Sequence, residues 1–180
     1  MPEPSGAQWC ARFPTSASVG DLLPEFRDRV NAFISAIKRG GATVSVAATY
    51  RPPERAYLMH WCCRIASGEQ APTAPVPMAG VDIDWRHGGD LAAARGAASA
   101  MMKGYAIKFP AALVSRHTQR RAIDMNIAWK GALRVTDFDG VVHAIDAPCD
   151  HMNPILHEVG RSFGVIKLVK DPPHWSDDGR

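Results

Sequence analysis

Three side chains that could together bind a metal ion are spread over the second half of the chain. His117 lies just before a segment of alternating polar and apolar residues, and Asp124 lies inside that segment. An ionised carboxylate in the interior of a strand is costly unless it is paired or binds a metal. His174, far away in the sequence, is the best candidate for a third ligand. Two imidazoles and one carboxylate, with a fourth position for water, are the ligands of a catalytic zinc ion.

A second carboxylate accompanies the last of these ligands. The segment Asp171-Pro172-Pro173-His174-Trp175 contains two adjacent prolines, which restrict the backbone. We therefore expect an extended segment that holds Asp171 and His174 in a nearly fixed relation. A carboxylate next to a metal site can take a proton from the water that is activated there. Asp171 is our candidate for this general base.

Each of these residues also has an interpretation without a metal. His117 is followed and preceded by arginines and could be an ordinary surface residue. Asp124 could be a solvated strand residue paired with a neighbouring cation. Asp171 and His174 could belong to a polar C-terminal tail. Residue types and spacing alone leave these alternatives open.

Other kinds of site find little support in the sequence. There is no glycine-rich nucleotide-binding loop, no GxSxG elbow and no HExxH motif. Ser115 lies close to His117, but no orienting acid accompanies the pair, so a serine hydrolase is not indicated. The four cysteines do not form a disulfide framework, and Cys62-Cys63 lie in an apolar helical segment, where we expect buried thiols.

Length and charge set the broad class of the protein. A chain of 180 residues can bury a sizeable core, and we expect a single domain over 1–180 with an irregular segment at 1–18. The net charge of +3 is too small to indicate nucleic acid or an anionic membrane. No segment is typical of a signal peptide or a membrane span, so we expect the protein to stay in the cytoplasm as synthesised unless it is released. We also expect a monomer.

The charge is unevenly distributed along the chain. Residues 103–134 contain seven basic residues and a single acidic one, Asp124. The basic excess therefore surrounds a proposed ligand, where it could steer an acidic substrate toward the site.

Hydrophobic periodicity predicts the elements that must position these residues. Asp21 and Asn153 are candidate N-caps of two helices, and Gly residues follow both helices. Lys130-Gly131 and Asp139-Gly140 predict tight turns between strands, and 171–180 is expected to be irregular. Residues 81–85 predict a short strand or an extended segment. Helices are predicted at 22–39, 53–68, 90–103 and 154–163, and strands at 42–50, 122–129, 132–136, 141–145 and 165–169. The pattern is typical of an α+β fold with a mainly antiparallel sheet.

Three segments, in this order, resemble the motifs of a known family. Residues 115–124, SRHTQRRAID, resemble the SxHxxGxAxD motif of the D-alanyl-D-alanine carboxypeptidase family of zinc peptidases. That family includes the L-alanoyl-D-glutamate endopeptidases found among phage endolysins. Residues 171–175 resemble its closing acid-x-x-His motif, in the Asp form typical of the endolysin-like branch. Tyr50-Arg51-Pro52 resembles its Tyr-Arg segment, so the resemblance spans Tyr50–Trp175.

The resemblance implies a role for each matched residue. It implies Zn²⁺ as the cofactor, bound by His117, Asp124 and His174, with Asp171 as the general base. Arg51 would contact the substrate carbonyl or carboxylate and stabilise the developing oxyanion. Ser115 would support substrate or ligand binding with a hydrogen bond. We also expect substrate contacts from Tyr50, Trp175 and Arg120. The implied fold is the small α+β fold shared with the hedgehog signalling domain, an antiparallel sheet with helices packed on one face.

One position departs from the family's motif. Arg120 stands where the motif has glycine. Glycine at such a position usually indicates a positive φ or a close backbone approach, and a larger residue would cost roughly 1–2 kcal/mol if that conformation is kept. Arg120 could narrow the cleft or offer a cation to an acidic muropeptide. It removes no ligand, so we expect zinc binding to survive.

Together these features predict a zinc-dependent peptidase that hydrolyses peptidoglycan stem peptides. The bond could be the terminal D-Ala-D-Ala bond or the L-Ala-D-Glu bond, and the sequence leaves both open. The alternative is a non-catalytic, zinc-stabilised binding or structural module with the same fold, which the arginine at position 120 favours. A phage-type lysin and an intracellular peptide-recycling enzyme fit the sequence equally well.

Overall fold

The computed structural model describes residues 1–180, and internal contacts group them into two compact units. Unit 1 comprises Met1–Thr15 and Arg51–Thr118, and unit 2 comprises Ser16–Tyr50 and Gln119–Arg180. Each unit has its own cluster of buried apolar side chains. The single domain over 1–180 stays a prediction.

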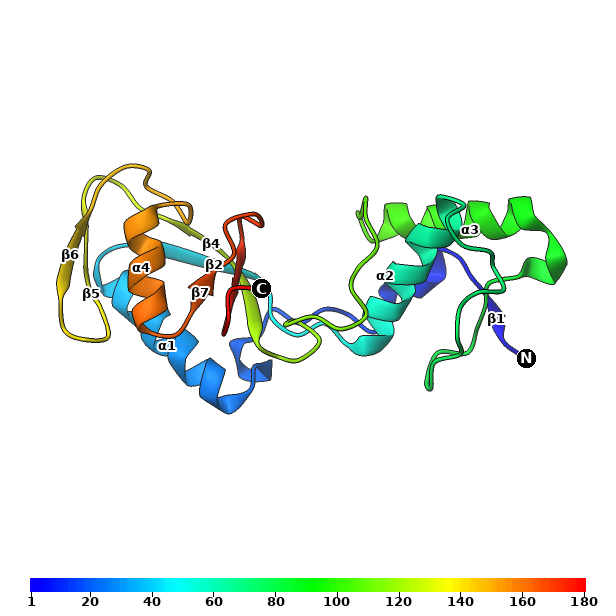
Figure 1. Ribbon diagram of the computed structural model, residues 1–180, viewed down its shortest axis with the longest axis horizontal. Coiled ribbons are helices and arrows are strands. Elements are labelled where there is room, and N and C mark those ends of the chain that lie inside the picture. Colours follow the sequence, from blue (N-terminus) through cyan, green and yellow to red (C-terminus); the bar gives the residue numbers. More distant parts are fainter. The chain divides into compact units, whose positions relative to one another are not determined.

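Unit 2 is built on a four-stranded sheet in which every neighbouring pair is antiparallel (Figure 1). The strands follow the order β2 (Thr43–Ala48), β4 (Ala122–Ala128), β8 (His174–Ser176) and β7 (Ile166–Lys167). On β4 the apolar residues predicted to share one face, among them Ile123 and Met125, are fully buried. The predicted alternation along this strand is therefore confirmed.

Two helices cover the apolar face of this sheet. Helix α1 (Pro24–Arg39) contributes Phe33, and α4 (Pro154–Ser162) contributes Leu156, to the same core as Ile123. Because the helices pack on the face that bears Ile123, the alternate residues of β4 lie on the opposite face. The architecture is α+β with mostly antiparallel sheets, which confirms the predicted fold class.

The two helices begin in different ways. Asn153 caps α4 as predicted, because its side chain accepts hydrogen bonds from the backbone N–H groups of Ile155 and Leu156. Asp21 does not cap α1. It lies in a short 3-10 helix, η2 (Val19–Asp21), and α1 starts at Pro24, whose missing N–H costs nothing at the first helical position.

A separate hairpin extends unit 2. β5 (Leu133–Thr136) pairs with β6 (Val142–Ile145), and the predicted turn at Asp139-Gly140 joins them. Gly131 has a φ of +68°, which is consistent with the predicted turn after β4. The strands on either side of that turn do not pair, however: β5 pairs with β6, and β4 pairs with β2 and β8.

Unit 1 consists mainly of two packed helices. α2 (Pro53–Ala66) and α3 (Leu91–Gly104) share a core with Trp9 from the 3-10 helix η1 (Ala7–Ala11). β1 (Glu3–Pro4) pairs in parallel with β3 (Ile83–Asp84), and a third 3-10 helix, η3, covers His87–Gly89. The segment 1–18 therefore contains short regular elements rather than being wholly irregular.

The adjacent cysteines of unit 1 lie in its core. Cys62 and Cys63 are buried and unpaired, as predicted, and burial raises the pKa of the Cys62 thiol to about 12.

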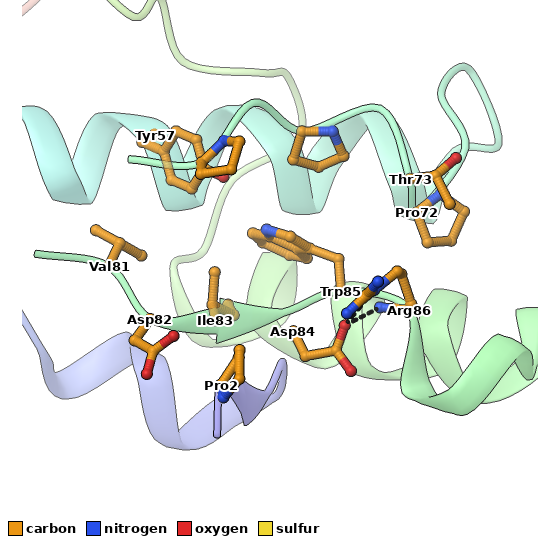
Figure 2. Close-up of a pocket in the computed structure, with 12 residues that line it drawn as sticks. Pro2, Tyr57, Pro72, Thr73, Val81, Asp82, Ile83, Asp84, Trp85 and Arg86 are labelled. Atoms are coloured by element: carbon orange, nitrogen blue, oxygen red, sulfur yellow. Dashed lines mark hydrogen bonds and ion pairs between the residues drawn. The ribbon is translucent and has the colours of Figure 1, made fainter. Parts of the chain in front are cut away.

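Unit 1 also contains a cavity of about 470 Å³ beside Tyr57 and β3. Proline rings lie along one side of the cavity, and an Asp84–Arg86 ion pair lies at one end (Figure 2). No helix of the chain is both long enough and apolar enough to cross a bilayer.

The structure corrects the prediction for the end of the chain. Residues 171–180 are not an irregular tail, because His174–Ser176 forms β8 between β4 and β7. The two prolines do not extend the backbone either. The His174 N–H donates to the Asp171 carbonyl at 3.0 Å, which closes a turn immediately before the strand.

Candidate metal centre

Strand pairing places two of the predicted ligands next to each other. Asp124 on β4 and His174 on β8 are directly opposite partners in the antiparallel ladder. Opposite residues on neighbouring strands project to the same face, with Cβ atoms about 4.5–5.5 Å apart. Both side chains therefore lie on the face away from α1 and α4. The register of β2 shifts between Val46 and Ala48 beside Asp124, the kind of irregularity that often accompanies functional sites.

The third predicted ligand, His117, comes from the turn that leads into β4. The Thr118 N–H donates to Ser115 Oγ at 3.3 Å, and the Thr118 hydroxyl donates to the Ser115 carbonyl at 2.9 Å. The Arg51 N–H donates to the His117 carbonyl at 3.2 Å, which anchors the same turn to the Tyr-Arg segment. Ser115 thus supports the backbone around the candidate ligand, and Arg51 lies beside it.

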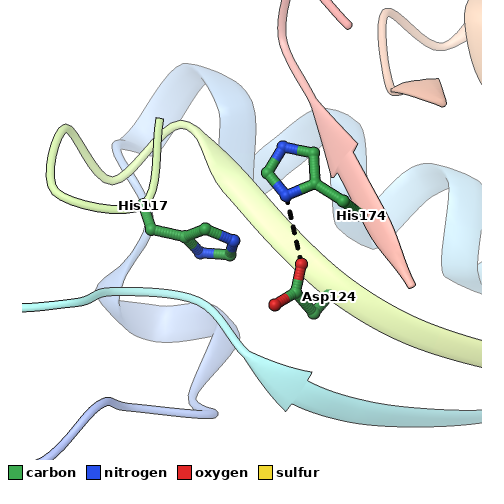
Figure 3. A group of neighbouring side chains, drawn as sticks. All are labelled: His117, Asp124 and His174. Atoms are coloured by element: carbon green, nitrogen blue, oxygen red, sulfur yellow. Dashed lines mark hydrogen bonds and ion pairs between the residues drawn. The ribbon is translucent and has the colours of Figure 1, made fainter. Parts of the chain in front are cut away.

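Together these three side chains form a group that could hold a metal ion. One ligand atom from each of His117, Asp124 and His174 lies within 4.8 Å of the others (Figure 3). His117 and His174 are 5% and 6% exposed, so neither is the surface residue of the metal-free interpretation. Two imidazoles and a carboxylate converging on one point suit a borderline-soft divalent cation such as zinc.

The hydrogen bonds of His174 strengthen this fit. Its Nε2 lies 3.0 Å from the Arg180 carbonyl oxygen, and because a carbonyl can only accept, Nε2 must carry the hydrogen. Its Nδ1 lies 3.2 Å from Asp124 Oδ1. In a neutral ring that nitrogen is an acceptor facing an anionic acceptor, so a cation has to lie between them. That cation can be a proton or a metal ion.

The surroundings of His174 favour a proton at this position. Burial by itself lowers the pKa of His174. The hydrogen bonds to Asp124 and Arg180 and the charges of Asp124 and Asp171 outweigh it, so the pKa lies above its usual value. The site is therefore built to hold positive charge.

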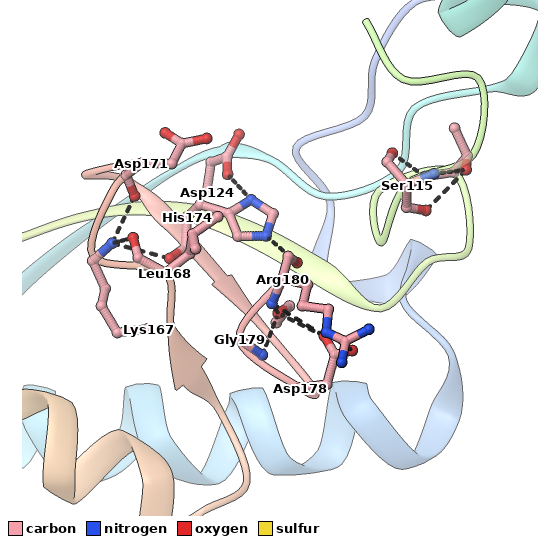
Figure 4. Close-up of polar contacts among 11 residues, drawn as sticks. Ser115, Asp124, Lys167, Leu168, Asp171, His174, Asp178, Gly179 and Arg180 are labelled. Atoms are coloured by element: carbon pink, nitrogen blue, oxygen red, sulfur yellow. Dashed lines mark hydrogen bonds and ion pairs between the residues drawn. The ribbon is translucent and has the colours of Figure 1, made fainter.

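The predicted general base lies on the turn just before β8. Asp171 is exposed, and its charge acts on His174, which places its carboxylate near the ligands. Figure 4 shows the Asp171 carboxylate on the same side of β8 as that of Asp124. Asp171 thus lies near the candidate ligands but outside the ligand group itself.

Sequence reasoning missed a residue that holds this turn in place. Lys167 on β7 is 7% exposed, and its Nζ donates to the carbonyls of Leu168 and Asp171 at 2.6 Å each and of His174 at 3.1 Å. Burial lowers the pKa of Lys167, against the charges of Asp171 and Asp124. The sequence could have indicated this residue, because Lys167 stands within the apolar segment 165–169 and a buried ammonium needs hydrogen-bond partners.

The arginine in the motif's glycine position keeps the glycine conformation. Arg120 has a φ of +60°, as expected for that position. Its guanidinium lies 4.4 Å from the centroid of the Tyr50 ring, a cation–π contact. The residue adopts a strained backbone and stacks on the neighbouring Tyr-Arg segment.

One predicted substrate contact is wrong. Trp175 is completely buried and packs against Phe33 and His157 beneath the sheet. Alternation along β8 turns its side chain into the core while His174 faces the opposite side. Trp175 therefore supports the strand that carries His174 and is not accessible to substrate.

Comparison with known proteins gives no family assignment: no protein-family model and no curated protein matches the chain.

Proposed function

We propose that the chain is a zinc-dependent peptidase that hydrolyses peptidoglycan stem peptides, either at a D-Ala-D-Ala bond or at an L-Ala-D-Glu bond. The observation that supports this most is the convergence of His117, Asp124 and His174 on one point, with Asp171 beside it. These are the four residues that the motif resemblance assigns to zinc binding and general base catalysis. The substrate class rests on that resemblance alone.

In this proposal Asp171 and Arg51 have different chemical roles. A bound zinc ion would polarise the scissile carbonyl and lower the pKa of water to about 7. The Asp171 carboxylate would accept a proton from the attacking water and deliver it to the leaving amine nitrogen. The C–N bond breaks, and the water oxygen becomes part of the new carboxylate. The Arg51 guanidinium would donate hydrogen bonds to the substrate oxygen on which negative charge develops.

The second candidate is a zinc-stabilised binding or structural module without turnover. Arg120 favours it, because its side chain stacks on Tyr50 at a position where the related motif has no side chain. The two candidates share the metal and differ in the role of Asp171. A peptidase needs a proton acceptor beside the metal, whereas a structural site does not. Asp171 is an exposed carboxylate on a turn held by Lys167, so the peptidase is the preferred proposal.

The direct test is digestion of purified muropeptides by the zinc-loaded protein, followed by mass spectrometry of the products. We expect either loss of a terminal D-Ala or cleavage between L-Ala and D-Glu. Asp171→Ala should abolish this while binding zinc as the wild type does. If zinc-loaded wild type leaves every fragment unchanged, the peptidase is rejected and the binding module is favoured.

A further inference from the structure

The chain segment that follows β8 folds back onto the candidate metal centre. Ser176 is completely buried, and its Oγ accepts hydrogen bonds from the N–H groups of Gly179 at 2.9 Å and Arg180 at 3.0 Å. Asp178 Oδ1 accepts a further bond from the Arg180 N–H at 3.1 Å. We call residues 176–180 the hook. It brings the Arg180 carbonyl to within 3.0 Å of His174 Nε2 (Figure 4).

The backbone of the hook requires a glycine. Gly179 has a φ of +79°, a conformation that L-residues rarely adopt. A Cβ atom at this position would lie 2.9 Å from Ile166 Cγ2 on β7, closer than such atoms normally approach. Any larger residue would therefore strain the backbone and press against the neighbouring strand, and the Arg180 carbonyl would move.

We propose that the hook is a positioning element of the metal centre, in which the Arg180 backbone carbonyl fixes the hydrogen of His174 on Nε2 and so presents Nδ1 as the metal ligand. The inference rests on the proposed metal centre and adds to it a segment outside all three motifs. Ligating histidines commonly donate their other ring N–H to a carbonyl or carboxylate, and loss of that partner typically costs 10–100-fold in metal affinity.

The contact involves the main chain of Arg180 and not its side chain. The guanidinium is 87% exposed and lies 3.8 Å from Asp178. The proposed role is therefore separate from the charge of the Arg180 side chain. Replacement of the arginine side chain should leave the metal centre unchanged, whereas displacement of its carbonyl should not.

Zinc affinity, measured by competition with a chromophoric chelator, tests the inference in the full-length chain. Gly179→Val displaces the hook by strain, and Ser176→Ala removes the acceptor that closes it. We expect each variant to bind zinc 10–100-fold more weakly than the wild type. Arg180→Ala is the matched control and should retain wild-type affinity. Thermal unfolding of the metal-free proteins shows whether each variant is folded.

A second measurement distinguishes positioning from general loosening. Long-range ¹H–¹⁵N NMR of the histidine rings should show His174 with hydrogen on Nε2 in the wild type and in Arg180→Ala, and zinc should shift the Nδ1 resonance. Folded hook variants that keep wild-type zinc affinity would overturn the inference, as would zinc on Nε2.

If the wild type binds zinc in this way but hydrolyses nothing, the proposed function fails and the hook stands. If the wild type binds no zinc, both fail.

Discussion

At the scale of single residues, Arg120 combines a strained backbone with a favourable side-chain contact. The left-handed conformation costs an L-residue about 1–2 kcal/mol, and an exposed cation–π contact returns about 0.5–1 kcal/mol. The cation–π contact therefore offsets part of the backbone strain of the arginine. Its presence beside Tyr50 changes the surface next to the Tyr-Arg segment without altering the ligand set.

Two substitutions at this position separate the strain from the contact. Arg120→Gly and Arg120→Ala both remove the cation–π contact, but only glycine adopts a φ of +60° without strain. We expect the glycine variant to be more stable than the alanine variant by about 1 kcal/mol, measured by urea denaturation. Equal stability of the two variants would contradict the assigned backbone strain.

Asp171 carries the sharpest residue-level prediction. Asp171→Asn preserves the shape of the side chain but cannot accept the proton, so kcat should fall about 10²–10⁴-fold. Zinc affinity should not change, because the carboxylate lies outside the ligand group. Steady-state kinetics and chelator competition measure the two quantities. Asp139→Asn, on the exposed turn of the β5–β6 hairpin, is the control. A variant that keeps full activity would exclude Asp171 as the base.

At the scale of elements, β4 was predictable and β8 was not. The alternation of Ala122–Ala128 predicts its strand and its buried face correctly, because one face packs on helices. β8 has only three residues and follows a turn with two prolines, so no local pattern marks it. Its pairing with β4 depends on tertiary contacts, and this pairing brings Asp124 and His174 together across a sequence separation of 50.

The turn before β8 depends on Lys167. Replacing this residue with methionine keeps the length of the side chain but removes the ammonium's hydrogen bonds to three carbonyls, each of which keeps one backbone N–H donor. We expect Lys167→Met to lower the free energy of unfolding by at least about 2 kcal/mol in urea denaturation, since hydrogen bonds from a charged group are stronger than neutral ones. Lys170→Met, on the exposed part of the same turn, should have no measurable effect. A neutral outcome for Lys167→Met would mean that the ammonium does not hold the turn.

At the scale of the whole molecule, the sequence predicted the class of fold but not the division into units. The helices and strands follow from hydrophobic periodicity and caps, as Asn153 and Pro154 illustrate. The grouping depends on which apolar faces meet. Trp9 joins α2 and α3, whereas Phe33 joins the sheet, and no local pattern separates these two sets of buried side chains. The hydrogen bond between His174 Nε2 and the Arg180 main-chain oxygen could not be predicted either, because the sequence does not indicate where a main-chain group lies.

The stabilisation from His174 in the metal-free protein and the stabilisation from bound zinc should depend on pH in opposite directions. The folded pKa of His174 lies above its ordinary value of 6.5, so in the metal-free protein its stabilising contribution is complete at lower pH and is lost as pH rises through the raised pKa. Zinc binds only the deprotonated rings, so its stabilisation grows as pH rises. The increase in Tm on adding zinc should therefore be larger at pH 8 than at pH 5.5, as differential scanning calorimetry would measure. An increase that is independent of pH would exclude histidine ligands.

In the proposed metal centre, His117, Asp124 and His174 bind one zinc ion. Native mass spectrometry with chelator competition tests it most directly. We expect one zinc per wild-type chain and a large loss of affinity in each of three variants: His117→Ala, Asp124→Ala and His174→Ala. The control His60→Ala, on α2 of unit 1, should bind zinc as the wild type does. A wild-type chain without zinc, or three ligand variants that keep wild-type affinity, would contradict it.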